Sequence, residues 1–444
     1  MTSTLLRADI VLTLDAQDHI YRPGYLIIEG NRLAEAGPLG SLAGRHCDLE
    51  IDLGNRLVMP GLVNAHTHTP MVLFRGLAEG HSLFTFEGWY EAIRTWESML
   101  TPELIPPAVA VSCAEMIRTG TTCFADQYFH TGSAVPTVRQ SGLRAAIAYG
   151  IVELGNQEAR LRELARAETF LREIQGDPLI QGWLGPHAFF VDNSPEAIRQ
   201  ELELAGRYRA GLHFHLATSG EEDRFCHEHY GHGAVAEMEA LGVLEHRLLA
   251  AHCITVSLDD LPTLAAHPFT AVIAPSACMR SGAGAAPLKA MRAAGVNTAL
   301  GTDNVANANS YDLFGEMGAA AKLMSLREHQ PAAVPARNIV EMATMGGARA
   351  LGLEREIGSL EPGKRADLIA LDLGEIGWAP DGGQDLFTAL VYSVSGLHVT
   401  DVMVDGNWLL RQRAWQTLDY AASRRELAGA LAELRRRRAR MEGS

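Results

Sequence analysis

Short apolar runs alternate with helical patterns from about residue 58 to residue 326. Each run has the length of a buried strand, and the stretch after it repeats apolar positions with a helical period. The apolar runs are residues 62–65, 122–126, 143–151, 180–185, 212–216, 248–252, 271–274 and 296–300, and the helical stretches include 107–118, 157–174, 195–208, 233–241 and 286–294. Strands that alternate with helices are typical of parallel sheets. Eight such units predict an α/β fold with a closed (β/α)8 TIM barrel.

The two ends of the chain carry strand patterns without intervening helices. These patterns cover residues 5–15, 25–29, 367–370 and 402–408, with turn sequences at 29–31 and 404–407. We expect both termini to combine in a small β-sandwich domain made of residues 1–57 and 358–420. The barrel then occupies residues 58–357. The pattern of residues 415–440 predicts a C-terminal helix pair, and residues 421–444 are assigned to a C-terminal helix.

Composition and charge exclude several classes of function. Hydrophobic residues make up 47% of the chain and charged residues 20%, as in ordinary globular proteins. The formal net charge of −15 argues against a nucleic-acid partner, which would need clustered Lys and Arg. The basic run at 435–438 is interpreted as the solvated face of a terminal helix, with an anionic partner as the alternative. The six cysteines are scattered, residues 1–15 do not resemble a signal peptide, and no apolar stretch would span a membrane. We therefore expect a cytoplasmic protein.

A pair of histidines follows the first barrel strand. His66 and His68 are two residues apart, so in a strand both imidazoles face the same side. Such a pair alone is weak evidence for a metal. However, His215 and His252 end the fifth and sixth predicted strands, and Asp303 follows the eighth. Because strand C-termini meet at one face of the barrel, all five side chains are expected at one site.

The chemistry of these groups suggests a role for each. His66, His68, His215 and Asp303 are expected to hold one divalent metal ion, either zinc or iron, since imidazole is a good ligand for both. Such an ion lowers the pKa of a bound water to about 7 and so supplies hydroxide at neutral pH. Asp303 is the expected carrier of the proton from this water to the leaving group. His252 is expected to hydrogen-bond the hydroxide or polarise the attacked carbon, with a buried structural imidazole as the alternative.

Seven segments resemble the amidohydrolase superfamily, and most closely its aminohydrolase branch, which includes the methylthioadenosine/S-adenosylhomocysteine deaminases and the triazine hydrolases. The segments are Pro-Gly-Leu-Val-Asn-Ala-His-Thr-His at 60–68, Gly-Thr-Thr-Cys-Phe-Ala-Asp at 120–126, Gly-Pro-His at 185–187, His-Phe-His-Leu at 213–216, Ala-His-Cys at 251–253, Leu-Gly-Thr-Asp at 300–303 and Gly-Ser-Leu-Glu-Pro-Gly-Lys-Arg-Ala-Asp-Leu at 358–368. The resemblance implies the barrel, the sandwich and one metal ion, because the fourth strand ends in Gly-Pro-His without the lysine of binuclear relatives. It also implies that His187 contacts the substrate, with a supporting hydrogen bond as the alternative.

Three positions depart from the pattern of these deaminases. Thr218 stands where they have the glutamate that protonates a ring nitrogen, and threonine is no general acid at neutral pH. Glu221 and Glu222 could fold back to replace it, although a solvated helix N-terminus is the favoured interpretation of both. Gly88 aligns with a glutamate that contacts ribose, and residues 273–276 replace a usual His-Asn-Pro. These changes predict a substrate outside the S-adenosylhomocysteine class.

The loop after the first strand is rich in aromatic residues. Phe84, Phe86, Trp89 and Tyr90 could form a wall for a flat or apolar ligand, with core packing as the alternative. Thr218, Gln127 and His81 are candidate polar contacts. We therefore expect Phe84, Trp89, Gln127, His187 and Thr218 to bind the substrate.

Three functional hypotheses remain open from the sequence. The first is hydrolysis of a non-peptide C–N bond in a small, heterocyclic substrate, with release of ammonia or an amine. The second is amide or lactam ring opening, or displacement of another leaving group, which needs no acid at Thr218. The third is a catalytically silent binding protein, which the intact set of histidines and Asp303 argues against. The resemblance and the aromatic loop also suggest a homodimer or larger assembly.

Overall fold

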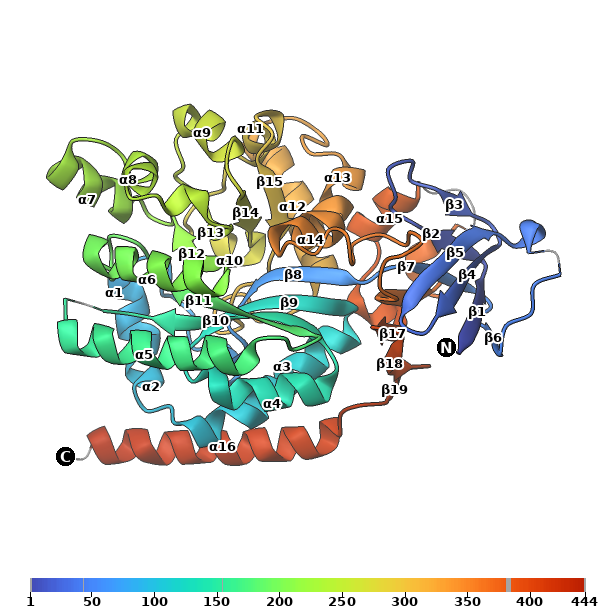
Figure 1. The fold of residues 1–444 in the computed structure, drawn as a ribbon, viewed down its shortest axis with the longest axis horizontal. Coiled ribbons are helices and arrows are strands. Elements are labelled where there is room, and N and C mark those ends of the chain that lie inside the picture. The colour runs from blue at the N-terminus through green and yellow to red at the C-terminus, as the bar shows by residue number, and fades with distance from the viewer. Residues whose placement is uncertain (1, 43, 154, 381–384, 443–444) are drawn as a thin grey trace.

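A barrel of eight parallel strands forms the centre of the molecule (Figure 1). The computed structural model describes residues 2–42, 44–153, 155–380 and 385–442. The barrel strands are β8 (Leu62–Thr67), β9 (Thr121–Tyr128), β10 (Arg144–Ile151), β11 (Ile180–Pro186), β12 (Leu212–Leu216), β13 (Leu248–His252), β14 (Phe269–Ile273) and β15 (Asn297–Leu300). They pair in chain order, and a parallel bridge between Thr67 and Asp303 closes the barrel between the segment after β15 and the end of β8. The predicted (β/α)8 barrel is confirmed.

Helices cover the outside of the barrel. They include α3 (Ile105–Arg118), α4 (Thr131–Ser141), α5 (Gln157–Ile174), α6 (Pro195–Tyr208), α7 (Glu221–Tyr230), α8 (Ala234–Ala240), α9 (Leu261–Ala265), α11 (Leu288–Ala293), α12 (Leu313–Arg327), α13 (Ala336–Glu341) and α14 (Gly347–Ala350). Local signals set where they begin. The side chain of Asn156 accepts from the Ala159 N–H at the start of α5, and Ser194 does the same for Ala197 at α6, where Pro195 opens the first turn.

The connection from β8 to α3 is longer than the other connections and builds one end of the barrel. It contains η2 (Thr69–Phe74), α1 (Phe86–Trp89), a π-helical turn η3 (Tyr90–Arg94), α2 (Thr95–Glu97) and η4 (Pro102–Leu104). We call residues 84–101 the covering segment. In Figure 1, α1 and α2 lie at the end of the barrel remote from the N-terminal strands. This is the carboxyl end of the barrel strands, where (β/α)8 enzymes carry their sites.

Strands from both termini form two further sheets beside the barrel (Figure 1). The first sheet is β5 (Arg32–Pro38), β4 (Gly24–Glu29), β1 (Ser3–Ala8) and β6 (Leu49–Asp52); the second is β19 (Ala414–Trp415), β18 (Asn407–Arg411), β17 (Val399–Val404), β16 (Leu368–Asp372), β7 (Arg56–Pro60), β2 (Ile10–Leu12) and β3 (Ile20–Tyr21). Buried side chains of both sheets, among them Leu6, Ile28, Val58 and Leu368, share one core. The prediction of one strand over residues 5–15 is wrong, because the chain changes sheets at Asp9, between β1 and β2.

The C-terminal region differs from the predicted helix pair. After β19, a single helix α16 (Tyr420–Glu442) runs along α3 (Figure 1), so the prediction of two helices over residues 415–440 is wrong. Residues 358–420 also include α15 (Leu386–Tyr392), which packs on the barrel helices α12 and α13. The predicted domain ranges include residues 1, 43, 154, 381–384 and 443–444, which lie outside the described residues.

The basic run on α16 is only partly solvated. Arg435 and Arg436 are exposed, as expected. Arg437 donates to the Met99 carbonyl at 3.0 Å and to Thr101 Oγ1 at 3.1 Å. The Arg438 guanidinium lies 4.2 Å from the centre of the Trp96 ring. Half of the run therefore docks on the covering segment. In the described part of the chain, no helix is long and apolar enough to cross a membrane.

Candidate active site

The predicted metal ligands converge at the carboxyl ends of the barrel strands. His66 and His68 come from the end of β8, His215 from β12, and Asp303 follows β15. Asp303 Oδ1 lies 3.4 Å from His66 Nε2 and 3.3 Å from His68 Nε2. His215 Nε2 lies 3.4 Å from His68 Nε2. The four side chains thus direct their donor atoms at one point.

The other ring nitrogen of each histidine is held by the protein. His68 Nδ1 donates to the Gln127 carbonyl at 2.6 Å, and His215 Nδ1 to the His187 carbonyl at 2.7 Å. His66 Nδ1 contacts His213 Nε2 at 2.7 Å. Such contacts fix the ring orientation and leave Nε2 for a metal. His213 was missed from the sequence, although it lies two residues before His215 in the same strand and so faces the same side.

The donor set fits a divalent transition metal. His66 Nε2 and Asp303 Oδ2 are buried and have no hydrogen-bond partner among the described residues. Burial holds the pKa of His215 well below its ordinary value, so this imidazole is neutral. Burial alone would raise the pKa of Asp303, but the neighbouring His66 and His68 outweigh it and hold that pKa well below its ordinary range. Neutral imidazoles and one carboxylate are the ligand types of zinc hydrolases.

His252 lies beside this cluster at the end of β13. Its ring centre is 5.3 Å from that of His66 and 5.4 Å from that of His215. Its Nδ1 is buried without a partner among the described residues, and Phe84 packs on the ring with centres 4.2 Å apart. Burial lowers the pKa of His252 to about 3, so the ring is neutral. Its backbone is left-handed at φ 79°, which turns the chain out of the strand and directs the ring into the site.

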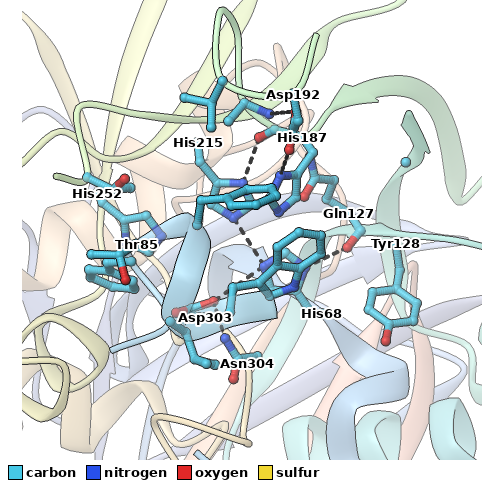
Figure 2. Close-up of a pocket in the computed structure, with 18 of the residues that line it drawn as sticks. His68, Thr85, Gln127, Tyr128, His187, Asp192, His215, His252, Asp303 and Asn304 are labelled. Atoms are coloured by element: carbon cyan, nitrogen blue, oxygen red, sulfur yellow. Dashed lines mark hydrogen bonds and ion pairs between the residues drawn. The ribbon is translucent and has the colours of Figure 1, made fainter. Parts of the chain in front are cut away.

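A cavity of about 860 Å³, including its open mouth, lies in front of these residues. Figure 2 shows His68, His187, His215, His252 and Asp303 facing it together. All five predicted substrate-binding residues line it, namely Phe84, Trp89, Gln127, His187 and Thr218. Phe86 also lines the cavity, whereas Tyr90 is exposed and stacks on Phe86. His81 is exposed and is not among the described residues that line the cavity.

Two of these residues carry contacts that limit what they can do. The His187 Nδ1 is hydrogen-bonded to Asp192, which is 3% exposed and also accepts from the Ala188 N–H at 3.0 Å. Nε2 is then the ring nitrogen of His187 that remains available to a ligand in the cavity. Gln127 Nε2 donates to three backbone carbonyls, those of Gly185, Pro186 and His213. Its amide group therefore ties neighbouring strand ends together.

Glu97 is a cavity residue that sequence reasoning missed. It lies on α2, lines the cavity and is 7% exposed. Tyr128 donates to its Oε1 at 2.9 Å, while its Oε2 has no hydrogen-bond partner among the described residues. Gly88, which aligns with the ribose-contacting glutamate of the related deaminases, packs against the Ser82 carbonyl. The cavity therefore has a buried carboxylate in the covering segment, supplied nine residues further along the chain.

Glu222 does not have the solvated position that the sequence suggested. It is 2% exposed, lines the cavity, and accepts from the Ala217 N–H at 3.1 Å through Oε1. Its Oε2 has no partner among the described residues. Burial raises the pKa of Glu222 to about 7. The interpretation of Glu222 as a solvated residue at a helix N-terminus is therefore wrong. Glu221 is half-buried and also lines the cavity.

Comparison with known proteins gives one consistent family. Residues 57–409 match the amidohydrolase family. A 5-methylthioadenosine/S-adenosylhomocysteine deaminase from Moorella thermoacetica is 38% identical over 89% of this chain and 92% of its own. A 5'-deoxyadenosine deaminase from Methanosarcina barkeri is 36% identical over 92% of this chain and 93% of its own. The solved structure of an adenosine deaminase from Xanthomonas campestris with bound zinc aligns with a TM-score of 0.91, at 28% identity, over 97% of this chain and 98% of that one.

The fold and the site define a metal-dependent hydrolase with a histidine- and carboxylate-lined centre. The chain belongs to the amidohydrolase family. Within it, the chain is a metal-dependent aminohydrolase that acts on non-peptide C–N bonds, as the sequence predicts.

Proposed function

We propose that the protein is a hydrolytic deaminase that releases ammonia from the purine ring of an unphosphorylated, adenosine-type nucleoside. The observation that carries this proposal is Glu97, a buried carboxylate that lines the same cavity as Asp303. Its Oε2 has no hydrogen-bond partner among the described residues, and the Arg94 guanidinium lies 3.9 Å away. Such a group accepts hydrogen bonds from paired hydroxyls, as on a ribose. The relatives named for adenosine-type substrates support the same class. This proposal is wider than the sequence prediction of a substrate outside the S-adenosylhomocysteine class, because Glu97 supplies a carboxylate that the sequence had led us to expect to be missing.

The charges of the cavity argue against a phosphorylated substrate. Among the described residues that line it, none is Lys or Arg. Its carboxyl groups are Glu97, Asp192, Glu221, Glu222 and Asp303. Arg94 lies outside this lining and is paired with Glu97. A phosphate would therefore be brought next to these carboxyl groups with no lining Lys or Arg to bind it, which costs free energy in a desolvated site. The preferred substrate is therefore neutral or cationic at the end remote from the purine.

We propose one zinc ion per chain, held by His66, His68, His215 and Asp303. When bound, the ion supplies a water of lowered pKa as nucleophile at neutral pH. Asp303 takes a proton from the attacking water and passes it to the leaving amine. His252 hydrogen-bonds the attacking oxygen through its free ring nitrogen.

Of the remaining predicted residues, all but Gln127 bind the substrate. His187, fixed by Asp192, directs Nε2 at a heteroatom of the base. Trp89 stacks on His187 with ring centres 5.1 Å apart, and Phe84 packs on His252. These rings form the flat side of the purine site. Gln127 keeps the strand ends in register, and Thr218 contacts the substrate edge.

Thr218 favours one alternative function. Ring opening of an amide or lactam, or displacement of another leaving group, needs no acid at this position, so the absence of the usual glutamate would carry no cost. In that case the enzyme releases no ammonia.

Ammonia release from a substrate panel tests these two functions. The zinc-loaded enzyme is assayed with 5'-methylthioadenosine, 5'-deoxyadenosine, adenosine and S-adenosylhomocysteine, with AMP as the phosphorylated control. We expect ammonia from at least one unphosphorylated nucleoside, none from AMP, and one metal per chain by elemental analysis. Ammonia from no purine, with one metal bound, would contradict the proposal and favour ring opening.

We also propose a homodimer or larger homo-oligomer in the cytoplasm. Phe86 and Tyr90 are exposed aromatic residues that a second copy could cover. The six described cysteines are free and five of them are buried, which suits a reducing compartment. Light scattering of the purified enzyme gives the oligomeric state.

A further inference from the structure

The proposed deamination needs a proton at a ring nitrogen, and Thr218 cannot supply it at neutral pH. Attack on the ring carbon places negative charge on the neighbouring nitrogen, so a positioned acid accelerates the step by about 10²–10⁴-fold. Thr218 is half-buried in the cavity lining, where a longer acidic side chain would have reached the substrate. A deaminase with Thr218 at this position therefore needs another acid close to this point of the cavity.

Glu222 brings a carboxyl group to the main chain just before Thr218. It lies in the first turn of α7, and its side chain folds back so that Oε1 accepts from the Ala217 N–H at 3.1 Å. Ala217 is the residue between the metal-ligand strand end and Thr218. This hydrogen bond fixes one oxygen, while Oε2 has no partner among the described residues. Glu222 is one of the residues that line the cavity, and its side chain is buried, with 2% of the residue exposed.

The surroundings of Glu222 favour its acid form. Burial raises its pKa to about 7, although the Ala217 N–H acts in the opposite sense. Glu221 and Asp223 on the same helix raise it further. Cys253, just after β13, and Cys226 on α7 lie close enough to Glu222 for its carboxylate to raise the pKa of each thiol further, beyond the larger effect of burial. No lysine or arginine is found among the described cavity-lining residues to offset these groups.

We propose that Glu222 is the general acid of this enzyme and gives its proton to the ring nitrogen beside the attacked carbon. This inference rests on the proposed deaminase function. As the C–O bond forms, Glu222 protonates the ring nitrogen, and Asp303 takes one proton of the water. Asp303 then gives that proton to the amino group, the C–N bond breaks, and ammonia leaves. The remaining hydroxyl proton returns to Glu222 as the carbonyl forms, so the product keeps its ring N–H and both residues regain their starting states.

The matched pair Glu222→Gln and Glu228→Gln tests the proposal. Glu228 is exposed on the same helix, so the chemical change is the same. We expect Glu222→Gln to lower kcat by about 10²–10⁴-fold with KM changed by less than about threefold, while Glu228→Gln keeps wild-type values. Wild-type activity should fall as pH rises through about 7, and this fall should vanish in the Glu222→Gln variant. In a Thr218→Glu background, Glu222→Gln should cost little. Unchanged kcat in Glu222→Gln would overturn the proposal.

A second measurement needs neither metal nor substrate. A ¹³C-carboxyl NMR titration of the metal-free wild-type enzyme should place the midpoint of Glu222 near 7, against 4.5 for an ordinary glutamate. Because the folded state then holds a proton that the unfolded state has lost, the free energy of unfolding should fall between pH 4.5 and about 7. Glu222→Gln should lack this fall. A midpoint near 4.5 would overturn the acid role even if the enzyme is a deaminase. Failure of the wild type to release ammonia would instead count against the proposed function.

Discussion

The metal side of the cavity and the covering segment opposite it are built in different ways. On the metal side, the ligands lie at or just after the carboxyl ends of the barrel strands β8, β12 and β15. The second nitrogen of each histidine ligand is bound by neighbouring main chain or by His213. In the covering segment, Trp89 and Glu97 lie on short helices joined by a π-helical turn, and Phe84 lies in the turn before the first of them. That segment is held from outside by Arg437 and Arg438 of α16.

This difference places the catalytic groups on one side of the cavity and the groups that select the substrate on the other. The hydrogen bonds between strands fix the position of each strand end. The geometry of the metal ligands can therefore be kept when the sequence of other parts of the chain changes. The short helices of the covering segment are held by α16, so they can shift with the loss of few contacts. Because they line the cavity, their position decides which substrate fits. Changes on the metal side should therefore lower turnover or metal affinity, whereas changes in the covering segment should alter substrate preference.

The largest effect is expected from Asp303→Asn. The amide keeps the size of the side chain but cannot carry the water's proton, so kcat should fall by about 10²–10⁴-fold. The measurement is ammonia release at saturating zinc, with bound metal determined in parallel. Retained turnover in the metal-loaded variant would show that another group carries the proton.

A smaller effect is expected from His213→Ala on the same side. Removing the partner of His66 frees that ligand to turn, and loss of such supporting contacts lowers metal affinity by about 10–100-fold. Zinc competition with a chelator gives the affinity, and His246→Ala, a partly exposed histidine before β13, is the control. Equal zinc affinity in both variants would mean that the strand alone orients His66.

Glu97→Gln tests the covering segment. Hydrogen bonds to a charged group contribute about 1.5–3 kcal/mol, and glutamine keeps part of them, so kcat/KM for the nucleoside should fall about tenfold. Activity on the free base should hardly change, because it has no ribose. Glu91→Gln, exposed in the same segment, is the control. Equal losses on nucleoside and free base would exclude a ribose contact.

The smallest effect is expected from Arg438→Ala. The cation–π contact with Trp96 is worth about 0.5–1 kcal/mol, so KM should rise about two- to fivefold while kcat is kept. Arg435→Ala, exposed on the same helix, is the control. A fall in kcat with unchanged KM would mean that α16 acts on the metal side instead.

The sequence predicts the metal side better than the covering segment. His66, His68, His215, His252 and Asp303 could be assigned because strand periodicity fixes which side chains meet at a barrel end. Glu97 and Glu222 could not, because their positions depend on how short helices and a folded-back side chain settle in three dimensions. The same holds for Asp192, whose contact with His187 depends on the path of a loop.

The errors in the fold have related causes. Residues 5–15 alternate like one strand, but the chain crosses between sheets at Asp9, and a hydrophobic pattern does not reveal such a corner. The predicted helix pair over 415–440 is one helix after a short strand. A helical repeat of apolar residues shows that a region is helical but not at which residue the helix begins. The ends of helices are therefore the least reliable part of a prediction from sequence.

The pairing of β7 with β16 has a consequence for synthesis of the chain on the ribosome. The two strands are separated by about 300 residues, which take about 15–60 s to translate at about 5–20 residues per second. During that time β7 has an open edge where β16 will pair, while the barrel strands emerge one after another. Arg437 and Arg438, which dock on the covering segment, leave the ribosome after β16. A nascent chain can therefore contain every metal ligand and still lack a finished cavity. Until β16 is made, the open edge of β7 can also pair with a strand of a neighbouring nascent chain.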